Sequence, residues 1–122
     1  MQKTFIHYLF VFCTNGKKRL LLSEIHADFA SLAYKFCYEL GYELCSLQIT
    51  EDFIVSMEVK TEVSDESPHT FITNFKAYMG GELRKKYSFL KTRTPGMWTR
   101  QHLIQTIGQA QPNLISDFVD AQ

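Results

Sequence analysis

Apolar residues recur along the chain with two periods, one of two residues and one of three to four. The period of two is clearest in Phe53–Thr61, where every second residue from Phe53 to Val59 is large and apolar. Tyr42–Ile49 precedes this segment, and the two are separated by the acidic turn Thr50–Asp52. The pattern predicts two strands that pair as an antiparallel hairpin.

Two further strands are predicted near the ends of the chain. Thr4–Cys13 is rich in Phe, Tyr, Leu and Val, and Met97–Ile107 has a similar character. After the first of these, Asn15-Gly16 is a dipeptide typical of hairpin turns. The following Arg19–Leu22 is therefore expected to return as a short strand arm.

The period of three to four predicts helices. One begins after Ser23, a plausible N-cap, and carries its apolar stripe to Leu40. A second begins at Ser67-Pro68, and Gly80-Gly81 is expected to interrupt it. A last helix is predicted from Pro112 to Gln122.

The predicted order is strand, helix, strand, strand, helix, strand, helix. This order predicts an α+β protein of the ferredoxin-like split βαβ type, with an antiparallel sheet, two helices on one face and a C-terminal helix. No linker or repeat divides the sequence, so we expect one domain over residues 1–122.

The composition narrows the class. The chain has 122 residues, of which 45% are hydrophobic and 14% aromatic, and this exceeds what a disordered chain contains. No apolar run approaches the roughly 18 residues that span a bilayer. The apolar N-terminal segment lacks a small-residue cleavage site. We therefore expect a cytoplasmic protein without a membrane partner.

The candidate chemical groups are scattered. Cys13, Cys37 and Cys45 have no metal-binding spacing and are expected to be buried free thiols. The four histidines form no HxH or HxxxH pair, although His7 and His102 lie on predicted strands that could bring them together.

The charge is balanced overall but uneven along the chain. The formal net charge is zero, yet the basic residues gather in two stretches. They are Lys17, Lys18, Arg19, Arg84, Lys85, Lys86, Lys91, Arg93 and Arg100. Such stretches can contact phosphate or can form an ordinary solvated surface.

Four segments, taken in order, resemble a known family. They are "VFCTNGKKRLL", "ELGYELCSLQITEDFIVSMEV", "SPHTFITNFKAYMGGELRKKYSFLK" and "MWTRQHLIQTIGQAQPNLISDFVDAQ". Together they resemble the single-tyrosine HUH transposases of the insertion-sequence 200/605 class. The resemblance implies two metal-binding histidines at positions i and i+2 of the central strand. It also implies a nucleophilic tyrosine on the last helix, a glutamine four residues later, and a dimer.

The sequence departs from this pattern at the chemical positions. The histidine pair falls on Phe53 and Val55, the tyrosine on Phe118, and only Gln122 keeps the family residue. Phenylalanine and valine cannot bind a metal, and Phe118 has no hydroxyl group. We therefore predict no metal cofactor and no catalytic residue, and expect Phe118 to contact Phe53 or Val55 within one chain or across a dimer.

What remains is a DNA-binding role. The resemblance implies recognition of hairpin or single-stranded DNA ends by a homodimer, and domestication as a regulator is one form of this role. Whether the chain is an enzyme stays open, since the family activity is DNA transposition but its histidine pair and tyrosine are absent. The nine basic residues named above are the predicted phosphate contacts, and Trp98 and Tyr87 are candidates for stacking on bases. The alternative is a protein-interaction module on the same dimeric fold, which the acidic stretch Glu51–Glu66 favours.

Overall fold

The computed structural model describes residues 4–63, 66–93, 96–107 and 112–122. Its strands form one antiparallel sheet of four strands in the order β2-β3-β1-β4. The elements along the chain are β1 (Phe5–Cys13), the short 3₁₀ turn η1 (Asn15–Lys17), α1 (Ser23–Glu39), β2 (Glu43–Thr50), β3 (Ile54–Glu62), α2 (Pro68–Lys86), α3 (Phe89–Arg93), β4 (Leu103–Thr106) and α4 (Pro112–Asp120). The ferredoxin-like split βαβ prediction is confirmed.

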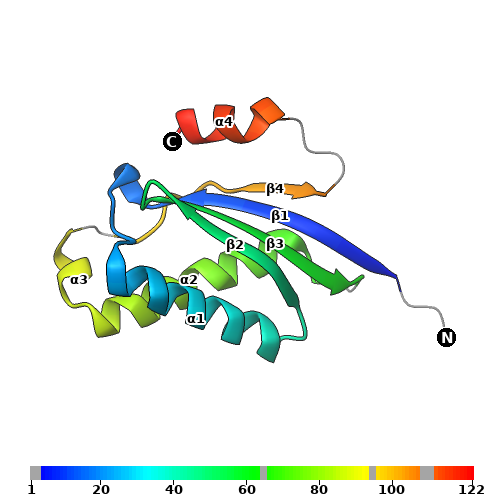
Figure 1. Cartoon of the computed structure of the whole chain (residues 1–122), viewed down its shortest axis with the longest axis horizontal. Helices are drawn as coiled ribbons and strands as arrows, with labels where there is room; N and C mark the ends of the chain where they lie inside the picture. Colours follow the sequence, from blue (N-terminus) through cyan, green and yellow to red (C-terminus); the bar gives the residue numbers. More distant parts are fainter. Residues whose placement is uncertain (1–3, 64–65, 94–95, 108–111) are drawn as a thin grey trace.

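Figure 1 shows that the helices divide between the two faces of the sheet. α1 and α2 run across one face, while α4 lies across the other. The core fills the space between the sheet and α1 and α2. Its centre is aromatic, and the rings of Phe12, Phe29 and Phe36 each pack 5.4–6.1 Å from that of Phe75. Edge-to-face aromatic packing of this kind holds α2 against β1 and α1.

Both predicted starts of the long helices can be compared with the structure. Ser67 caps α2, because its hydroxyl accepts a hydrogen bond of 3.0 Å from the Thr70 amide. Ser23 does not cap α1. It is the first residue of that helix, has a left-handed φ of 46°, and follows Leu22, which occupies the N-cap position without a side-chain hydrogen bond.

Two predictions about turns and breaks are wrong. Arg19–Leu22 forms no strand, because Leu20 and Leu21 turn inward and are buried beside the helices. Gly80-Gly81 does not interrupt α2, which continues to Lys86. Gly80 instead permits a close approach, since a Cβ there would lie 3.3 Å from both Met97 Cβ and Trp98 Nε1.

The last strand is shorter than the sequence predicts. Met97–Ile107 was expected to be extended throughout, but only Leu103–Thr106 pairs with β1, and Trp98 adds a single bridge to Thr14. Between them the Thr99 amide still donates to the Cys13 carbonyl of β1 at 3.0 Å, and residues 100–102 belong to no strand. The basic stretch after α2, expected to be a connection, contains the short helix α3. Within the described ranges, no helix has the length and apolar character needed to cross a bilayer.

Candidate functional site

The alternation of β3 decides which residues face α4. Val55, Met57 and Val59 are fully buried in the core on the side of α1 and α2. Successive side chains of a strand point to opposite faces, so Ile54 and Ser56 point the other way. These two residues and Thr50 line a groove with Ile115 and Val119 of α4, and it has a volume of 420 Å³.

This arrangement corrects the assignment of the histidine pair to Phe53 and Val55. Phe53 lies in the turn before β3, where its carbonyl accepts the Thr14 amide at 3.0 Å. Val55 is on the face away from α4, and with no exposed surface it is inaccessible to a partner protomer as well. The expected contact between Phe118 and Val55 is therefore wrong. On the face that α4 covers, β3 presents Ile54 and Ser56 to the groove.

The groove beneath α4 does not fit the metal that the resemblance implies. Ile54 carries no ligand atom, Ser56 offers only a neutral hydroxyl group, and Asp120 is the one carboxylate among the described residues that line the groove. Across the described residues, no three His, Cys, Asp or Glu side chains gather closely enough to hold a metal ion.

Phe118 lies on α4, and Gln122 lies four residues later, just after the helix ends. Phe118 is half-buried, and its carbonyl accepts a hydrogen bond of 3.1 Å from the Gln122 side-chain amide. The same amide lies 3.4 Å from Oε1 of Gln101, just before β4. Gln122 therefore ties the end of the chain to its own helix and to the approach to β4.

The histidines pair differently from the expectation. β1 and β4 bring Val11 opposite Leu103 and Tyr8 opposite Thr106, so His7 and His102 lie at opposite ends of this pairing. His102 instead meets His69, at the start of α2, with 3.0 Å between Nε2 of His102 and Nδ1 of His69. Burial, and then the positive charges of Lys76 and His69, lower the pKa of His102 to about 4. His102 is therefore neutral near pH 7.

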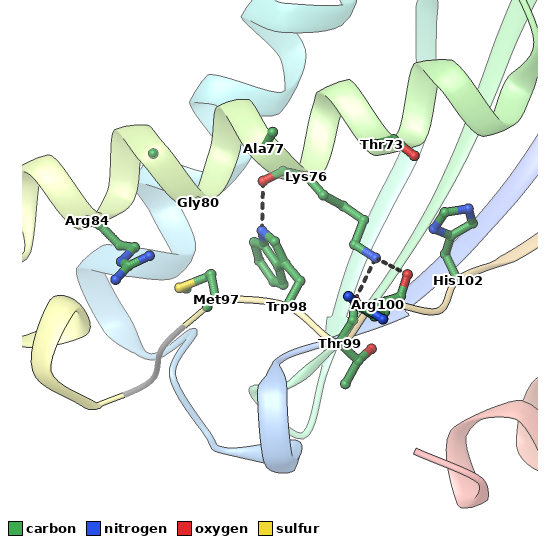
Figure 2. A pocket seen from close by; sticks show the side chains of 12 residues that line it. Thr73, Lys76, Ala77, Gly80, Arg84, Met97, Trp98, Thr99, Arg100 and His102 are labelled. Atoms are coloured by element: carbon green, nitrogen blue, oxygen red, sulfur yellow. Dashed lines mark hydrogen bonds between the residues drawn. The ribbon is translucent and has the colours of Figure 1, made fainter.

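A buried lysine holds the segment before β4. Lys76, on α2, is 7% exposed, and its ammonium donates hydrogen bonds to the carbonyls of Thr99 (2.8 Å) and Arg100 (3.5 Å) (Figure 2). It also donates to the Gln101 carbonyl at 3.3 Å. These contacts satisfy carbonyl groups that a longer β4 would have paired with β1. Desolvation lowers the pKa of Lys76 to about 8. The sequence did not predict that Lys76 is buried. The one indication is that it directly follows Phe75 of the apolar stripe.

The structure brings the basic stretches together. Asn15, just before the first stretch, donates its backbone amide to Met97 at 2.9 Å and its side-chain amide to Gly96 at 3.4 Å. Gly96 and Met97 in turn line a groove with Arg84 and Arg100. Residues far apart in the sequence therefore surround the segment 96–100.

Carboxylates already pair with some of these cations. Arg19 contacts Asp52 at 2.5 Å, Lys85 contacts Glu82 at 3.3 Å, and Lys86 contacts Asp28 at 2.8 Å. Lys17, Arg84, Lys91 and Arg100 have no ion pair with a described carboxylate. Lys18 makes other contacts, and the Arg93 side chain lies outside the described part of the chain.

The candidate aromatic and thiol groups have structural partners. The Tyr87 hydroxyl donates a hydrogen bond to Asp28, which raises the pKa of Tyr87 to about 12 and makes its phenolate a rare species. Trp98 packs edge-on against Phe12 at 5.1 Å and donates its indole N–H to the Lys76 carbonyl at 2.9 Å. Cys13 and Cys37 are buried thiols as predicted, but Cys45 is exposed on the edge strand β2.

Comparisons with known proteins agree with this geometry. No curated protein sequence matches the chain. A protein from Deinococcus radiodurans R1, described as a candidate transposase, has a crystal structure that superposes with a TM-score of 0.86 at 14% identity, covering 100% of this chain and 92% of that one. A REP-associated tyrosine transposase bound to a REP hairpin superposes with a TM-score of 0.56 at 10% identity, covering 99% of this chain and 65% of that one.

At 14% and 10% identity, the two structures support the fold alone. The sequence pattern of the family described as "Transposase IS200 like" matches residues 2–122, nearly the whole chain. The chain therefore belongs to the IS200-like transposase family.

Proposed function

We propose that this family member binds hairpin or single-stranded DNA without cleaving it. The observation that carries the proposal is the face of the sheet beneath α4. There β3 presents Ile54 and Ser56 and no histidine, and Phe118 stands where the resemblance implies the attacking tyrosine. A phenyl ring cannot attack a phosphodiester, and an aliphatic side chain cannot hold the metal that would polarise it.

Other hydroxyl groups do not supply the missing nucleophile. Tyr87 lies beyond the end of α2, and its hydroxyl group is bound to Asp28. Tyr78 packs on Phe36 with 5.1 Å between ring centroids, on the helix side of the sheet. Ser56 and Ser116 line the groove beneath α4 with Asp120, but no histidine is among the described residues that line it.

DNA binding is supported by the surface around residues 96–100. Arg84 and Arg100 line the groove beside this segment, and Lys17 lies two residues after Asn15, whose backbone amide donates to Met97. Lys91 lies on α3. A local concentration of cations binds phosphate even when a protein is neutral overall. The hairpin bound by the REP-associated transposase indicates the kind of DNA to test first.

A homodimer is part of the proposal. β2 and β4 are the two edge strands, and β2 is interrupted by an irregularity in register between Leu44 and Ser46. Such irregularities hinder edge-to-edge pairing. We therefore propose that the protomers join through the β4 edge or through α4. Light scattering at micromolar concentration would show twice the mass of one chain, and a monomeric mass would contradict this part.

The alternative function is a protein-interaction module. The outer surface of α1 favours it, because Tyr34 and Leu40 are about half exposed and Tyr38 is 84% exposed. Exposed aromatic side chains on one helix are typical of protein contacts. In this case DNA would not bind above the level expected for a neutral protein.

Two measurements test the proposal together. The first is fluorescence anisotropy with a labelled hairpin that carries a single-stranded tail, at several salt concentrations. We expect the logarithm of the association constant to fall linearly with the logarithm of the salt concentration. The Arg84→Gln variant should reduce the magnitude of this slope by about 0.7. The matched control is Lys35→Gln, an exposed lysine on α1 outside both basic stretches.

The second measurement looks for chemistry. The same DNA, incubated with Mg²⁺ or Mn²⁺, is run on a denaturing gel. We expect intact DNA and no covalent protein–DNA adduct. A cleaved strand or an adduct would contradict inactivity, whereas binding no stronger than that of a neutral control protein would favour the interaction module.

A further inference from the structure

The groove between α2 and residues 96–102 is a second cavity, separate from the one beneath α4. We call it the α2 groove, and its defining residues are Ala77, Gly80, Gly81, Arg84, Trp98 and Arg100 (Figure 2). Its volume is 470 Å³. This lies within the range of about 300–1,000 Å³ that small-molecule sites occupy.

The sequence of α2 creates the hollow. Residues 77, 80, 81 and 84 fall on one helical face, where three consecutive positions along that face are alanine or glycine. A Cβ added at Gly81 would meet nothing within 4 Å, so space remains open there. Gly80 differs, because Met97 and Trp98 already press against it at 3.3 Å.

The chemistry of the walls is both apolar and cationic. Met97 and Trp98 form the apolar wall, and Trp98 is fixed by its hydrogen bond to the Lys76 carbonyl. Arg84, Arg100 and Lys76 line the cavity, and none of the described residues that line it is an aspartate or a glutamate. Nε of Arg84 is buried and has no hydrogen-bond partner among the described residues. A buried guanidinium N–H without an acceptor favours an anionic ligand.

These features suit one ligand class. A flat apolar wall beside two guanidinium groups matches an unpaired nucleotide, with a base to lie against an aromatic side chain and a phosphate for the cations. We propose that the α2 groove takes one unpaired nucleotide of bound single-stranded DNA, its base against Trp98 and its phosphate on Arg84 and Arg100. This inference rests on the proposed DNA binding and adds the place where an unpaired base is held.

The chain offers a direct readout, because Trp98 is its only tryptophan. Addition of a (dT)₁₂ oligonucleotide should quench the intrinsic tryptophan fluorescence, since a base would stack on or beside the indole. An oligonucleotide of the same length with abasic sites at every position carries the phosphates alone. It should quench little and bind at least tenfold more weakly.

A single substitution tests the cavity. Gly81→Leu fills open space without contacting the packed segment, so the protein should fold normally. We expect it to abolish the quenching by (dT)₁₂ and to weaken binding at least tenfold. Gly81→Ala is the matched control, since it makes a similar change in backbone freedom with little added volume, and it should bind within twofold of the parent chain.

The outcomes separate the two proposals. Equal binding and equal quenching by Gly81→Leu and the parent chain would overturn the nucleotide site while leaving DNA binding intact. Equal binding of (dT)₁₂ and the abasic oligonucleotide, both weakened by Arg84→Gln, would overturn base insertion and leave a phosphate contact only. Failure of the parent chain to bind either oligonucleotide or the hairpin would overturn both proposals.

Discussion

The two faces of the sheet are covered to different degrees. On the face beneath α1 and α2, Phe12, Met57 and Phe75 have no exposed surface. On the face beneath α4, Ile54, Ser56 and Phe118 stay half-buried, and a groove separates the helix from the strands. The face beneath α1 and α2 therefore supplies most of the stability of the fold. The face beneath α4 is open enough for reactive side chains to be present there or to be replaced.

The largest effect should come from truncating a ring on the closely packed face. Phe75→Ala should cost about 3–5 kcal/mol, because it removes a ring that packs against four others and leaves a cavity. Phe118→Ala should cost about 1 kcal/mol, since its ring is already partly in water. Urea unfolding of both variants measures the difference. Equal costs would mean that α4 packs as tightly as α2.

A histidine scan of β3 tests the corrected register. Val55→His should destabilise the fold by about 3 kcal/mol, because it places a polar ring in the closed core. Ser56→His should cost less than about 1 kcal/mol, since that position borders the groove beneath α4. The reverse order would restore the assignment of the metal pair to Phe53 and Val55.

The same register predicts where a metal site can be rebuilt. The double variant Ile54→His and Ser56→His should gain stability with Ni²⁺, by about 2.7 kcal/mol when the free metal is a hundredfold above its dissociation constant. The control double variant, Phe53→His and Val55→His, should gain nothing. Thermal unfolding with and without Ni²⁺ measures both, and stabilisation of the control alone would contradict the geometry.

The stability of the fold should depend on pH through His102, which lies beside the start of α2. Its pKa is about 4 in the folded chain and about 6.5 in an unfolded one. Between these values the unfolded chain binds more protons, so stability should fall as the pH drops from 6.5 to 4. His102→Gln should flatten this part of the curve in urea unfolding. An unchanged slope would mean that another group accounts for it.

The smallest effect concerns the turn between β2 and β3. Glu51 and Asp52 have left-handed φ angles of 54° and 64°, which asparagine tolerates better than glutamate does. Glu51→Asn should therefore stabilise the chain by about 1 kcal/mol. Glu51→Gln removes the charge but not the strain, so it should change little. Similar gains in both variants would assign the effect to charge.

Sequence patterns predicted the face beneath α1 and α2 better than the face beneath α4. The order of elements and the buried positions Val55, Met57 and Val59 follow from periodicity. The histidine pair was assigned to Phe53 and Val55, but the left-handed residues Glu51 and Asp52 leave Phe53 in the turn before β3, and Val55 faces the helices. A slip of one residue moves every side chain of a strand to the other face.

Other features could not be predicted because they depend on contacts distant in sequence. In the sequence, Lys76 looks like an ordinary polar helix residue. Its burial follows only from the contacts that it makes with the segment 99–101. That segment then loses its pairing with β1, and the predicted strand shortens to Leu103–Thr106. Gly80-Gly81 likewise reads as a break until Met97 and Trp98 are placed against the helix.

The alternation of β3 has a consequence for how this protein can evolve. The strand contains two interleaved sets of residues. The odd-numbered set runs from Val55 to Val59, and the even-numbered set runs from Ile54 to Glu58. Selection for folding acts on the first, while selection for activity acts on the second. Two codon changes, at Ile54 and Ser56, can therefore introduce or remove a pair of ligands. The core residues of β3, and with them the fold of the family, stay unchanged.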